Sequence, residues 1–505
     1  MFIVSAKEMY EIDRYTMHEI GLKSVLMENA GRAVSEKLRT HITHQDEVVV
    51  LSGGGHNGGD GFVVARTLHN LAYHVTVLQV VPDEKLVDET RQQKTLLQKC
   101  GGKITTVDLA SNSQCLSSAS VIVDAITGLG IKGHLRSPMT DIVYEVNQSE
   151  AFVCAIDMPS GLPADEGMDD FTAVNADMTV MIGAIKESAC VQETAPFYGA
   201  WELVHIGHPT QAFAPIKSRV VFDDADFKRT MPERKRHAHK GDHGRGLLIG
   251  GSDFMPGAVV LAGKAALKTG AGLLTVASTN QVIRQVANHC AEAMYIELPE
   301  QHGQIMPNNH LAMERFDAVA IGVGLGRQKE AGTFVASIVR TAECPLIIDA
   351  DGIFHLSTCL KEVKERSYPT IITPHPGEMS RLLDIDTKTL LKKPFYYSRK
   401  LAEMYDMYVI LKGKSTIITM PSGEQAVDVT GNPGLAKGGS GDVLTGIILA
   451  MVIQDQSVFQ ALCNACFLHG RSADLQVQQS HTVYDLMATD VINGIPMVYR
   501  TLCLS

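Results

Sequence analysis

The stretch TGNPGLAKGGSGDVLTGII, residues 430–448, carries six glycines and one proline and ends in an apolar run. A glycine-rich loop that leads into a helix presents backbone N–H groups and positive partial charge to an anion, often a phosphate. Asp442 stands where this loop becomes a helix. Its carboxylate either caps the helix, a position that favours Asp, or acts on a group held at the anion site. A cap does not need GGSG before it, so the choice depends on the rest of the chain.

Composition limits the class of protein. The chain has 505 residues, of which 45% are hydrophobic and 20% charged, as in ordinary globular proteins of two or more domains. Its net charge of −11 argues against a surface for nucleic acid or anionic membranes, because such surfaces need a basic excess. We therefore expect no nucleic-acid or membrane partner.

The cysteines and the start of the chain bear on compartment. The ten cysteines are scattered, and Cys463 and Cys466 form the one Cys-x-x-Cys, inside an apolar, Ala-rich run that favours buried helix thiols. The start MFIVSAKEMYEIDRY lacks a signal-peptide pattern. The longest apolar runs fall short of the roughly 20 residues that span a bilayer. These features predict a soluble, cytoplasmic protein.

The order of apolar segments predicts two α/β domains. Runs such as EVVVLSGG, HVTVLQVV, SVIVDAI, AFVCAIDMP, MTVMIGA and WELVHIG alternate with helical stretches, and several are apolar on both faces, as in doubly wound parallel sheets. Two amphipathic helices, residues 5–20 and 24–38, are expected on the first sheet. Prolines and charge clusters then mark a boundary near 212–220, and GRGLLIGGS, GLLTVAS, DAVAIGVG, CPLIIDAD, TIITPHPGE and YVILKGKSTIITM begin a second series. The predicted domains are 1–215 and 216–505.

Polar side chains follow several strands of the first domain. Gly53 to Gly61 holds six glycines after a strand, with Asn57 and Asp60 inside the loop, which differs from the G-x-G-x-x-G pattern. Asp124, and Asp157 with Ser160, follow two further predicted strands, where ligands bind in open α/β sheets, and Lys186 follows a fourth. Asn57, Asp124 and Ser160 offer oxygen ligands without thiolate or imidazole, which fits an alkali or alkaline-earth cation better than zinc. Each residue alone fits a turn better than a ligand site; as a set they predict a site.

These motifs resemble a known family. LMENAGRAV, GGGHNGGDGFVVAR, DAITGLGIKG and DMPSGL together resemble the N-terminal epimerase domain of the bifunctional NAD(P)H-hydrate repair enzymes, the YjeF family. The resemblance covers most of residues 1–210. His56 stands where the family commonly has Asn.

The second half resembles the ribokinase-like dehydratase of the same family over roughly 225–500. The matching runs include AIGVGLGR, LIIDADGI, TPHPGEMSRLL, VILKGKSTIIT and the opening stretch. The resemblance implies that Asp442 accepts the proton of an attacking hydroxyl, while backbone N–H groups of the loop stabilise the developing charge. Catalysis then outranks the helix-cap interpretation of Asp442.

The resemblance implies three sets of site residues in addition to Asp442, Asp157 and Lys186 as catalytic groups. The hydrate of the epimerase would contact His56, Asn57, Gly58, Gly59, Asp60, Gly128, Leu129, Gly130, Ile131, Lys132, Gly133, His134 and Asp157. The hydrate of the dehydratase would contact Ala258, Gly324, Gly326, His375, Gly377, Glu378 and Asp442. The nucleotide would contact Lys412, Gly413, Lys414, Ser415, Thr416, Asn432, Gly438, Gly439, Ser440 and Gly441.

Some of these residues have structural alternatives. His375 lies between two prolines, where core packing is poor, and we expect it to face substrate. The turn from Lys412 to Thr416 offers donors to phosphates, or is a β-turn with a solvated lysine. Asp349 and Asp351 fit metal support and turn chemistry equally well.

The implied activity is repair of hydrated NADH and NADPH. The first domain would interconvert the R and S hydrates, with Asp157 as the acid–base group and K⁺ held by Asn57, Asp124 and Ser160. The second would dehydrate the S hydrate at the expense of ADP, giving AMP and phosphate, with Mg²⁺ screening the phosphates. The resemblance also implies a homo-oligomer.

Two rivals remain at this stage. A vitamin-type kinase on the ribokinase-like domain explains Asp442 and leaves the first domain as a non-catalytic nucleotide-binding module. Alternatively, the dehydratase is fused to a sensor or oligomerisation module. The residues do not decide between NADH and NADPH hydrates, or between ADP and ATP.

Overall fold

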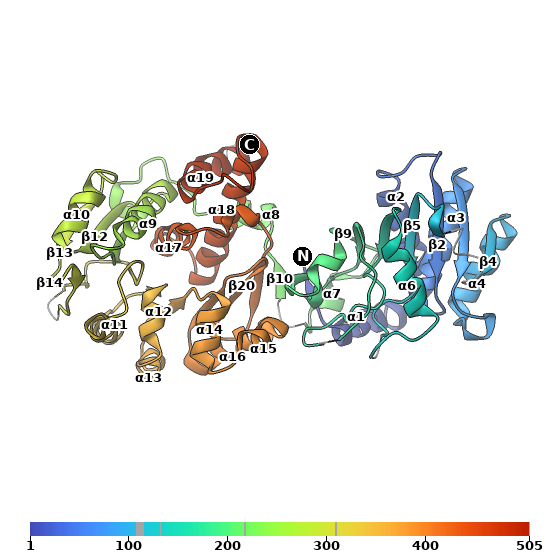
Figure 1. Ribbon diagram of the computed structural model, residues 1–505, viewed down its shortest axis with the longest axis horizontal. Coiled ribbons are helices and arrows are strands. Elements are labelled where there is room, and N and C mark those ends of the chain that lie inside the picture. Colours follow the sequence, from blue (N-terminus) through green and yellow to red (C-terminus); the bar gives the residue numbers. More distant parts are fainter. Residues whose placement is uncertain (108–115, 132, 169, 217–218, 309–310, 504–505) are drawn as a thin grey trace. The chain divides into compact units, whose positions relative to one another are not determined.

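The computed structural model describes residues 1–107, 116–131, 133–168, 170–216, 219–308 and 311–503, so that the predicted substrate residue Lys132 lies outside the described part. The chain divides into two compact units, Met1–Lys217 (unit 1) and Ser218–Ser505 (unit 2). Each unit is built from a largely parallel sheet with helices packed on it (Figure 1). The α/β class predicted from the sequence is confirmed.

Within its described residues, unit 1 has a seven-stranded sheet of order β4-β3-β2-β5-β6-β7-β9, and every pairing in it is parallel. Its strands are β2 (Glu47–Ser52), β3 (His74–Gln79), β4 (Lys103–Thr106), β5 (Val121–Ala125), β6 (Phe152–Ile156), β7 (Met178–Ile182) and β9 (Ala200–Val204). A separate parallel pair is β1 (Ile3–Val4) with β8 (Ile185–Lys186). The helices are α1 (Ala6–His18), α2 (Lys23–Leu38), α3 (His56–Asn70), α4 (Asp88–Lys99), α6 (Met139–Gln148) and α7 (Thr210–Phe213).

Strand β2 shows why this sheet is covered on both faces. Its side chains alternate between the faces, and all positions after Glu47 are buried. Val48 and Val50 join a core that includes residues of α2 and α3, whereas Val49 and Leu51 join a second core with residues of α6. The strand order reverses between β2 and β5, and in such sheets the ligand site lies at the carboxyl ends of the two strands at the reversal.

Unit 2 has a ten-stranded sheet of order β10-β21-β20-β19-β18-β17-β16-β11-β12-β13 in its described residues. The strands are β10 (Arg219–Val221), β11 (Arg245–Ile249), β12 (Leu273–Ser278), β13 (Met294–Glu297), β16 (Ala318–Ile321), β17 (Leu346–Ile348), β18 (Thr370–Ile372), β19 (Tyr408–Leu411), β20 (Thr416–Thr419) and β21 (Gln425–Asp428), beside the hairpin β14 (Glu300–Gln301) and β15 (Gln304–Ile305). Among the described strand pairs of this sheet, only β19–β20 and β20–β21 are antiparallel.

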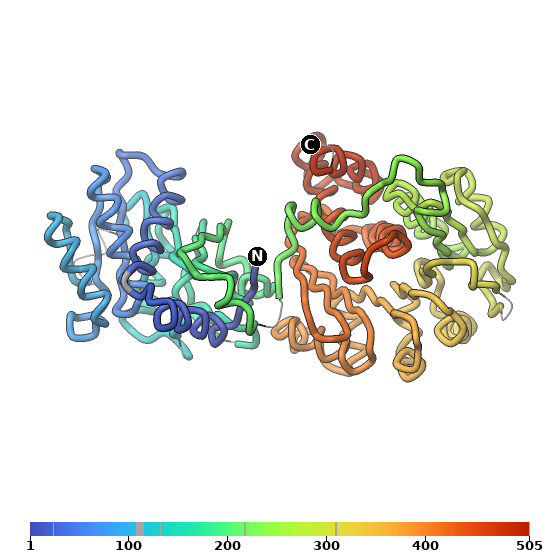
Figure 2. The backbone as a smooth tube through the Cα atoms, turned by 180° about the vertical axis from the view of Figure 1, so that it is seen from behind, coloured from blue at the N-terminus to red at the C-terminus, as the bar shows by residue number. Residues whose placement is uncertain are grey.

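The helices of unit 2 are α8 (Asp224–Thr230), α9 (Pro256–Thr269), α10 (Asn280–Ala287), α11 (Lys329–Thr341), α12 (Asp351–Leu356), α13 (Leu360–Lys364), α14 (Pro376–Leu383), α15 (Thr387–Lys392), α16 (Pro394–Tyr405), α17 (Ser440–Val452), α18 (Val458–Gln479) and α19 (Ala488–Leu502). Helix α17 packs against α9, α18 and α19 (Figures 1 and 2). A side chain at Gly446 would place its Cβ 2.0 Å from the Ala262 carbonyl oxygen, so glycine permits the close approach of α17 and α9. The opening stretch therefore continues into the core of unit 2.

Two smaller expectations are also answered. Cys463 and Cys466 are free, buried thiols on α18, as predicted, and burial raises the pKa of each. Among the described residues, no helix combines the length and apolar character needed to cross a bilayer.

Candidate functional site

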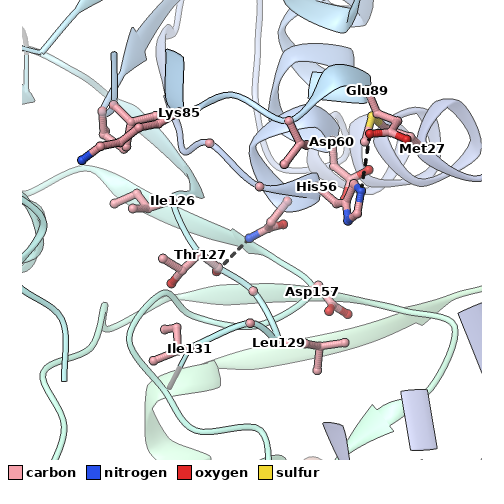
Figure 3. Close-up of a pocket in the computed structure, with 18 of the residues that line it drawn as sticks. Met27, His56, Asp60, Lys85, Glu89, Ile126, Thr127, Leu129, Ile131 and Asp157 are labelled. Atoms are coloured by element: carbon pink, nitrogen blue, oxygen red, sulfur yellow. Dashed lines mark hydrogen bonds and ion pairs between the residues drawn. The ribbon is translucent and has the colours of Figure 1, made fainter. Parts of the chain in front are cut away.

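A cavity of about 900 Å³ opens in unit 1 at the carboxyl ends of β2 and β5 (Figure 3). The glycine-rich turn before α3 forms one wall, and the segment after β5, from Ile126 to Ile131, contributes another. A Cβ at Gly53 would lie 1.9 Å from the Ile126 carbonyl oxygen, and one at Gly58 would lie 2.0 Å from that of Gly53. Glycine at these positions therefore lets the two strand ends meet closely enough to build the cavity.

Most of the predicted epimerase residues line this cavity. They are His56, Asn57, Asp60, Gly128, Leu129, Gly130, Ile131, His134 and Asp157. Gly58 and Gly59 are buried at the start of α3, and Gly133 adopts a positive φ of 83° outside the lining. His56 is largely exposed, with Nε2 3.8 Å from Glu89 Oε2.

The three candidate cation ligands converge on one segment. Asn57 Nδ2 donates to the Thr127 carbonyl oxygen (2.8 Å), and Ser160 Oγ accepts from the Thr127 N–H (2.8 Å). Asp124 accepts from Ser160 Oγ (2.5 Å) and from the Ser160 N–H (2.7 Å). Burial raises the pKa of Asp124 to about 6, although Ser160 opposes the shift. Asn57 Oδ1 is buried without a hydrogen-bond partner in the described part of the chain.

Asp157 projects into the cavity from the end of β6, while Lys186 lies behind it. Asp157 has a positive φ of 68°, and its Oδ1 accepts from the Ile182 N–H (2.9 Å) and from Lys186. Lys186 is fully buried and also donates to the carbonyl oxygens of Ile182 and Ala184, both at 3.0 Å. These three bonds occupy all the protons of the ammonium group. Lys186 is therefore placed to hold Asp157 rather than to contact a ligand.

Sequence reasoning missed the contribution of the first two helices. α1 supplies Met9, Tyr10 and Asp13 to the cavity wall, and α2 supplies further lining residues, of which Lys23 is charged. A carboxylate at Asp13 follows Met9 by four residues, so that both lie on one face of α1. The sequence signal that could have revealed Asp13 as a cavity residue is its position on the apolar face of an amphipathic helix.

Asp442 in unit 2 does not occupy the N-cap position of α17. Gly439, with φ of 92°, is the N-cap of α17, and Asp442 is the third residue of the helix. The helix-cap interpretation of Asp442 is therefore wrong. Burial raises the pKa of Asp442 to about 6, the carboxylates of Asp349 and Asp351 add to the shift, and Lys412 opposes it. Its carboxylate is poised to accept a proton near neutral pH.

Asp349, near Asp442, connects strand β17, the turn at Lys412 and helix α17. It follows β17, and its carboxylate accepts from Lys412 Nζ (3.0 Å) and from Thr445 Oγ1 of α17 (2.6 Å). Burial favours a higher pKa for Asp349, but the Lys412 charge and the hydrogen bonds outweigh it and hold the pKa below its ordinary value. A Cβ at Gly441 would lie 3.7 Å from Lys412 Nζ. The structure thus brings the Lys412 turn to the start of α17.

Asp351 stabilises the glycine-rich loop at residues 322–327, part of the AIGVGLGR run. It accepts from Arg327 Nε and from the Gly326 N–H, both at 2.9 Å. His355 Nε2 lies 2.9 Å from the Gly326 carbonyl oxygen. A Cβ at Gly324 would lie 3.1 Å from that of Ala258, so these two predicted residues are neighbours. Asp351 has the turn-stabilising role that the sequence left open.

His375 begins α14 as its N-cap. Its Nδ1 accepts from the N–H groups of Gly377 (3.1 Å) and Glu378 (3.3 Å), and the Glu378 carboxylate accepts from the His375 N–H (2.9 Å). This is a capping box with an imidazole in place of a hydroxyl. His375 Nε2 lies 3.4 Å from Glu378 Oε1, so both ring nitrogens face groups of α14, although 56% of the side chain is exposed.

The other predicted nucleotide residues lie on two turns. Lys412 to Thr416 joins the antiparallel strands β19 and β20, with Gly413 and Lys414 exposed. Asn432 accepts from the Gly434 N–H (3.0 Å) and donates to Asp474 (3.0 Å), which fixes the beginning of the glycine-rich loop.

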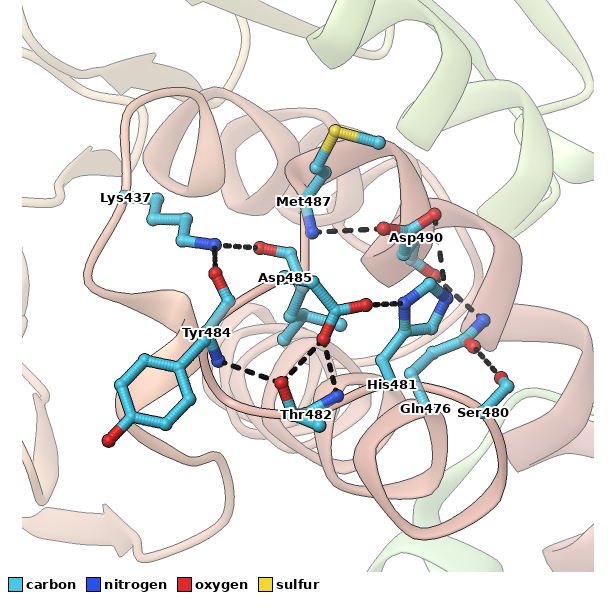
Figure 4. A network of polar contacts seen from close by, with 10 residues as sticks. Lys437, Gln476, Ser480, His481, Thr482, Tyr484, Asp485, Met487 and Asp490 are labelled. Carbon is cyan, nitrogen blue, oxygen red and sulfur yellow. Dashed lines mark hydrogen bonds and ion pairs between the residues drawn. The ribbon is translucent and has the colours of Figure 1, made fainter.

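A polar network fixes the other end of this loop (Figure 4). Lys437 Nζ donates to the carbonyl oxygens of Tyr484 (2.5 Å) and Leu486 (2.9 Å), in the turn before α19. That turn is itself closed by Asp485, which accepts from the Thr482 N–H and hydroxyl, both at 2.6 Å. The predicted residues Gly438, Gly439, Ser440 and Gly441 follow directly.

Comparisons with known proteins cover nearly the whole chain. A family model described as NAD(P)H-hydrate dehydratase matches residues 246–497, and one described as YjeF-related protein N-terminus matches residues 23–188. The chain is 34% identical to the bifunctional NAD(P)H-hydrate repair enzyme Nnr of Moorella thermoacetica, covering 99% of this chain and 97% of that one. It is 31% identical to the enzyme of the same name from Escherichia coli, covering 94% and 89%. Unit 2 is similar to the crystal structure of an ADP/ATP-dependent NAD(P)H-hydrate dehydratase from Bacillus subtilis, with 33% identity, a TM-score of 0.49, and coverage of 56% of this chain and 98% of that one.

Proposed function

The chain belongs to the family of bifunctional NAD(P)H-hydrate repair enzymes, and from this premise we propose that its unit 1 cavity epimerises the hydrates of NADH and NADPH while the Asp442 site of unit 2 dehydrates the S hydrate. One observation supports the assignment of the chemistry more than any other. Asp442 is a half-buried carboxylate at the start of α17, and burial raises its pKa to about 6, so it is basic in neutral solution and close to the positive end of the helix dipole.

In unit 2, a phosphoryl group would be transferred from the nucleotide to the ring hydroxyl of the hydrate. Asp442 accepts the hydroxyl proton as the oxygen attacks the terminal phosphorus, and N–H groups at Gly439 to Gly441 stabilise the charge on the phosphoryl oxygens. The ring nitrogen then expels phosphate, and loss of a proton from the neighbouring carbon restores the dihydropyridine. Phosphate leaves far more readily than hydroxide, which explains why a kinase-like site can run a dehydration.

The nucleotide, which we propose to be ADP, would lie along the turn from Lys412 to Thr416. Lys414 offers an exposed ammonium group there, whereas Lys412 holds Asp349. For Mg²⁺, the described residues do not form a site of their own, because Asp349 and Asp351 are engaged with Lys412 and Arg327 and no three metal-binding side chains gather.

In unit 1, water would leave the ring carbon and return on the other face. Lone-pair donation from the ring nitrogen breaks the C–O bond and leaves an iminium-like ring, to which water adds. Asp157 donates and accepts the proton near the hydroxyl, and Lys186 fixes its orientation. The small-alcohol kinase is the rival reading, and it leaves this cavity without a role.

K⁺ fits the residues at the start of α3. Asn57 Oδ1 is a buried acceptor without a partner among the described residues, and Asp124 and Ser160 are connected to Asn57 through Thr127. A monovalent cation held by these oxygens would order the glycine-rich turn against the segment after β5. It would thereby fix two walls of the cavity.

We expect replacement of Asn57 by alanine to raise the K⁺ concentration for half-maximal epimerisation by roughly 10- to 100-fold. The measurement titrates KCl at constant ionic strength with choline chloride, and follows both epimerisation and the unfolding temperature, which rises with a bound ion. Asn70→Ala, at the exposed far end of the same helix, is the matched control. The cation site would be contradicted if neither the unfolding temperature nor the epimerisation rate of the unaltered chain depends on the K⁺ concentration.

The function itself is tested with a mixed-epimer hydrate of NADH. Recovery of NADH absorbance is followed with ADP, with ATP and without nucleotide, after subtraction of spontaneous epimerisation. We expect complete recovery with ADP, which requires both activities in one chain. Recovery that stops when the S hydrate is spent would remove the epimerase assignment, and no recovery with either nucleotide would remove the dehydratase assignment.

A further inference from the structure

The two hydrates place a requirement on the cavity of unit 1. R and S hydrates carry the hydroxyl on opposite faces of the ring, so water must leave from one face and return to the other. A proton-transfer group is therefore needed on each side of the bound ring. Asp157 projects from the end of β6 and supplies one such group. This inference rests on the proposed epimerase function of the cavity.

Asp13 in the cavity wall forms a second acid–base pair with His208, which lies 195 positions away in the chain. Asp13 lines the cavity from α1, and its Oδ1 lies 2.8 Å from His208 Nε2. The His208 side chain is only 3% exposed, and its Nδ1 has no hydrogen-bond partner in the described part of the chain. Both residues lie outside the segment 23–188 that the N-terminal family model matches.

Gly183 connects this pair to the Asp157–Lys186 pair. A Cβ at Gly183, which has φ of 73°, would lie 2.8 Å from His208 Nδ1, so the imidazole packs directly on this backbone. The neighbours of Gly183 are Ile182, whose N–H bonds Asp157, and Ala184, whose carbonyl oxygen accepts from Lys186. One short segment thus positions both pairs.

Asp60 adds a third carboxyl group, and it comes from α3 instead of the sheet (Figure 3). It lines the cavity, and no hydrogen bond or ion pair to its carboxyl group occurs within the described ranges. Burial, and then the charges of Asp157 and Asp13, raise the pKa of Asp60 well above its ordinary value. A raised pKa favours the protonated form of this carboxyl group, which is the form that can donate a proton.

We propose that Asp60 is the catalytic proton donor and acceptor for the face of the ring that Asp157 does not reach, and that Asp13, held by His208, is its positioning residue. Asp60 gives its proton to the hydroxyl on its side, the C–O bond breaks as the ring nitrogen forms C=N, and water leaves. Water then adds to the other face, forming a new C–O bond, and its proton passes to Asp157. Proton exchange of both carboxyl groups with solvent water restores their starting protonation after each turnover, and no oxidant, reductant or co-reactant is consumed.

Oxygen exchange separates the two faces. In H₂¹⁸O, Asp60→Asn should lower interconversion of the hydrates by roughly 100-fold or more, while one epimer still exchanges its hydroxyl oxygen through Asp157. Asp157→Asn should show the complementary pattern, with exchange kept by the other epimer. Asp13→Asn keeps an acceptor for His208 Nε2 and removes the charge. It should show the same pattern of oxygen exchange as Asp60→Asn, with a smaller loss of interconversion.

The controls keep folding and chemistry apart. Glu11→Gln, an exposed acid on the same helix as Asp13, should behave as the unaltered chain in both exchange and interconversion. The dehydratase rate on the S hydrate and the unfolding temperature report the integrity of each variant. The inference is overturned if both Asp60→Asn and Asp13→Asn interconvert the hydrates normally, or if both epimers lose oxygen exchange equally. Either result leaves the epimerase function of the cavity intact. An unaltered chain that does not interconvert the hydrates overturns both.

Discussion

Replacing Asp442 by asparagine is expected to lower the turnover number of NAD(P)H-hydrate dehydration by roughly 100- to 10,000-fold, the range for loss of a general base. Asparagine has nearly the same shape and cannot accept the hydroxyl proton. The reaction is followed as NADH absorbance from the purified S hydrate with saturating ADP. Asp455→Asn, an exposed acid just beyond the other end of α17, is the control and should retain full activity.

The pH dependence of the unaltered enzyme gives an independent reading of the same group. Because burial raises the pKa of Asp442 to about 6, the basic form is lost as the pH falls below that value. The turnover number should therefore rise with pH up to about 6 and level off above it. A profile that lacks this limb, or an Asp442→Asn variant with near-normal turnover, would exclude Asp442 as the base.

The stability of this variant should move the opposite way from its activity. A carboxyl group with a raised pKa stabilises the fold while it is protonated, and that stabilisation is lost as the pH rises through the folded-state pKa. At neutral pH the ionised Asp442 is therefore unfavourable for folding, and the neutral asparagine should keep or raise the unfolding temperature. A loss of activity without a loss of stability separates catalysis from misfolding.

Much of the scaffold is predictable because it follows from local pattern. The apolar runs that form β2 and β5 and the glycines after β2 are short-range signals, and Asp124 and Asp157 lie at the strand ends that they predict. Asn57 and Asp60, predicted inside the loop, lie in α3, because the helix already begins at His56. β4 (Lys103–Thr106) was not predicted, because it is an exposed edge strand without an apolar run. Its residues show no pattern that distinguishes a strand from a loop.

The remaining parts of both sites arise from contacts between distant segments. The pairing of Lys412 with Asp349 joins residues 63 positions apart, and that of Asp13 with His208 joins residues 195 apart, so no local pattern contains either pair. His375 illustrates the converse: histidine is not a usual N-cap residue, and only the positions of the Gly377 and Glu378 N–H groups reveal the cap. Whether it also faces substrate stays a prediction.

Asp157→Asn should lower epimerisation by roughly 100- to 10,000-fold, because asparagine cannot carry the proton between the hydroxyl and water. With the mixed hydrate and ADP, recovery of NADH should then proceed normally until the S hydrate is spent and continue only at the spontaneous rate of epimerisation. This two-phase course keeps the dehydratase as an internal control in the same cuvette. A single, complete phase at the rate of the unaltered chain would exclude Asp157 as the acid–base group.

Stability complicates this substitution, and a second change resolves the ambiguity. Asp157→Asn leaves the fully buried Lys186 ammonium without its counter-charge, which typically lowers the free energy of unfolding by about 3–5 kcal/mol. Asp157→Asn combined with Lys186→Met removes both charges and should recover most of that stability. We expect the double variant to unfold close to the temperature of the unaltered chain and still fail to epimerise. If instead epimerisation returns with stability, the loss in the single variant reflects the unpaired lysine, and proton transfer belongs to another group of the cavity.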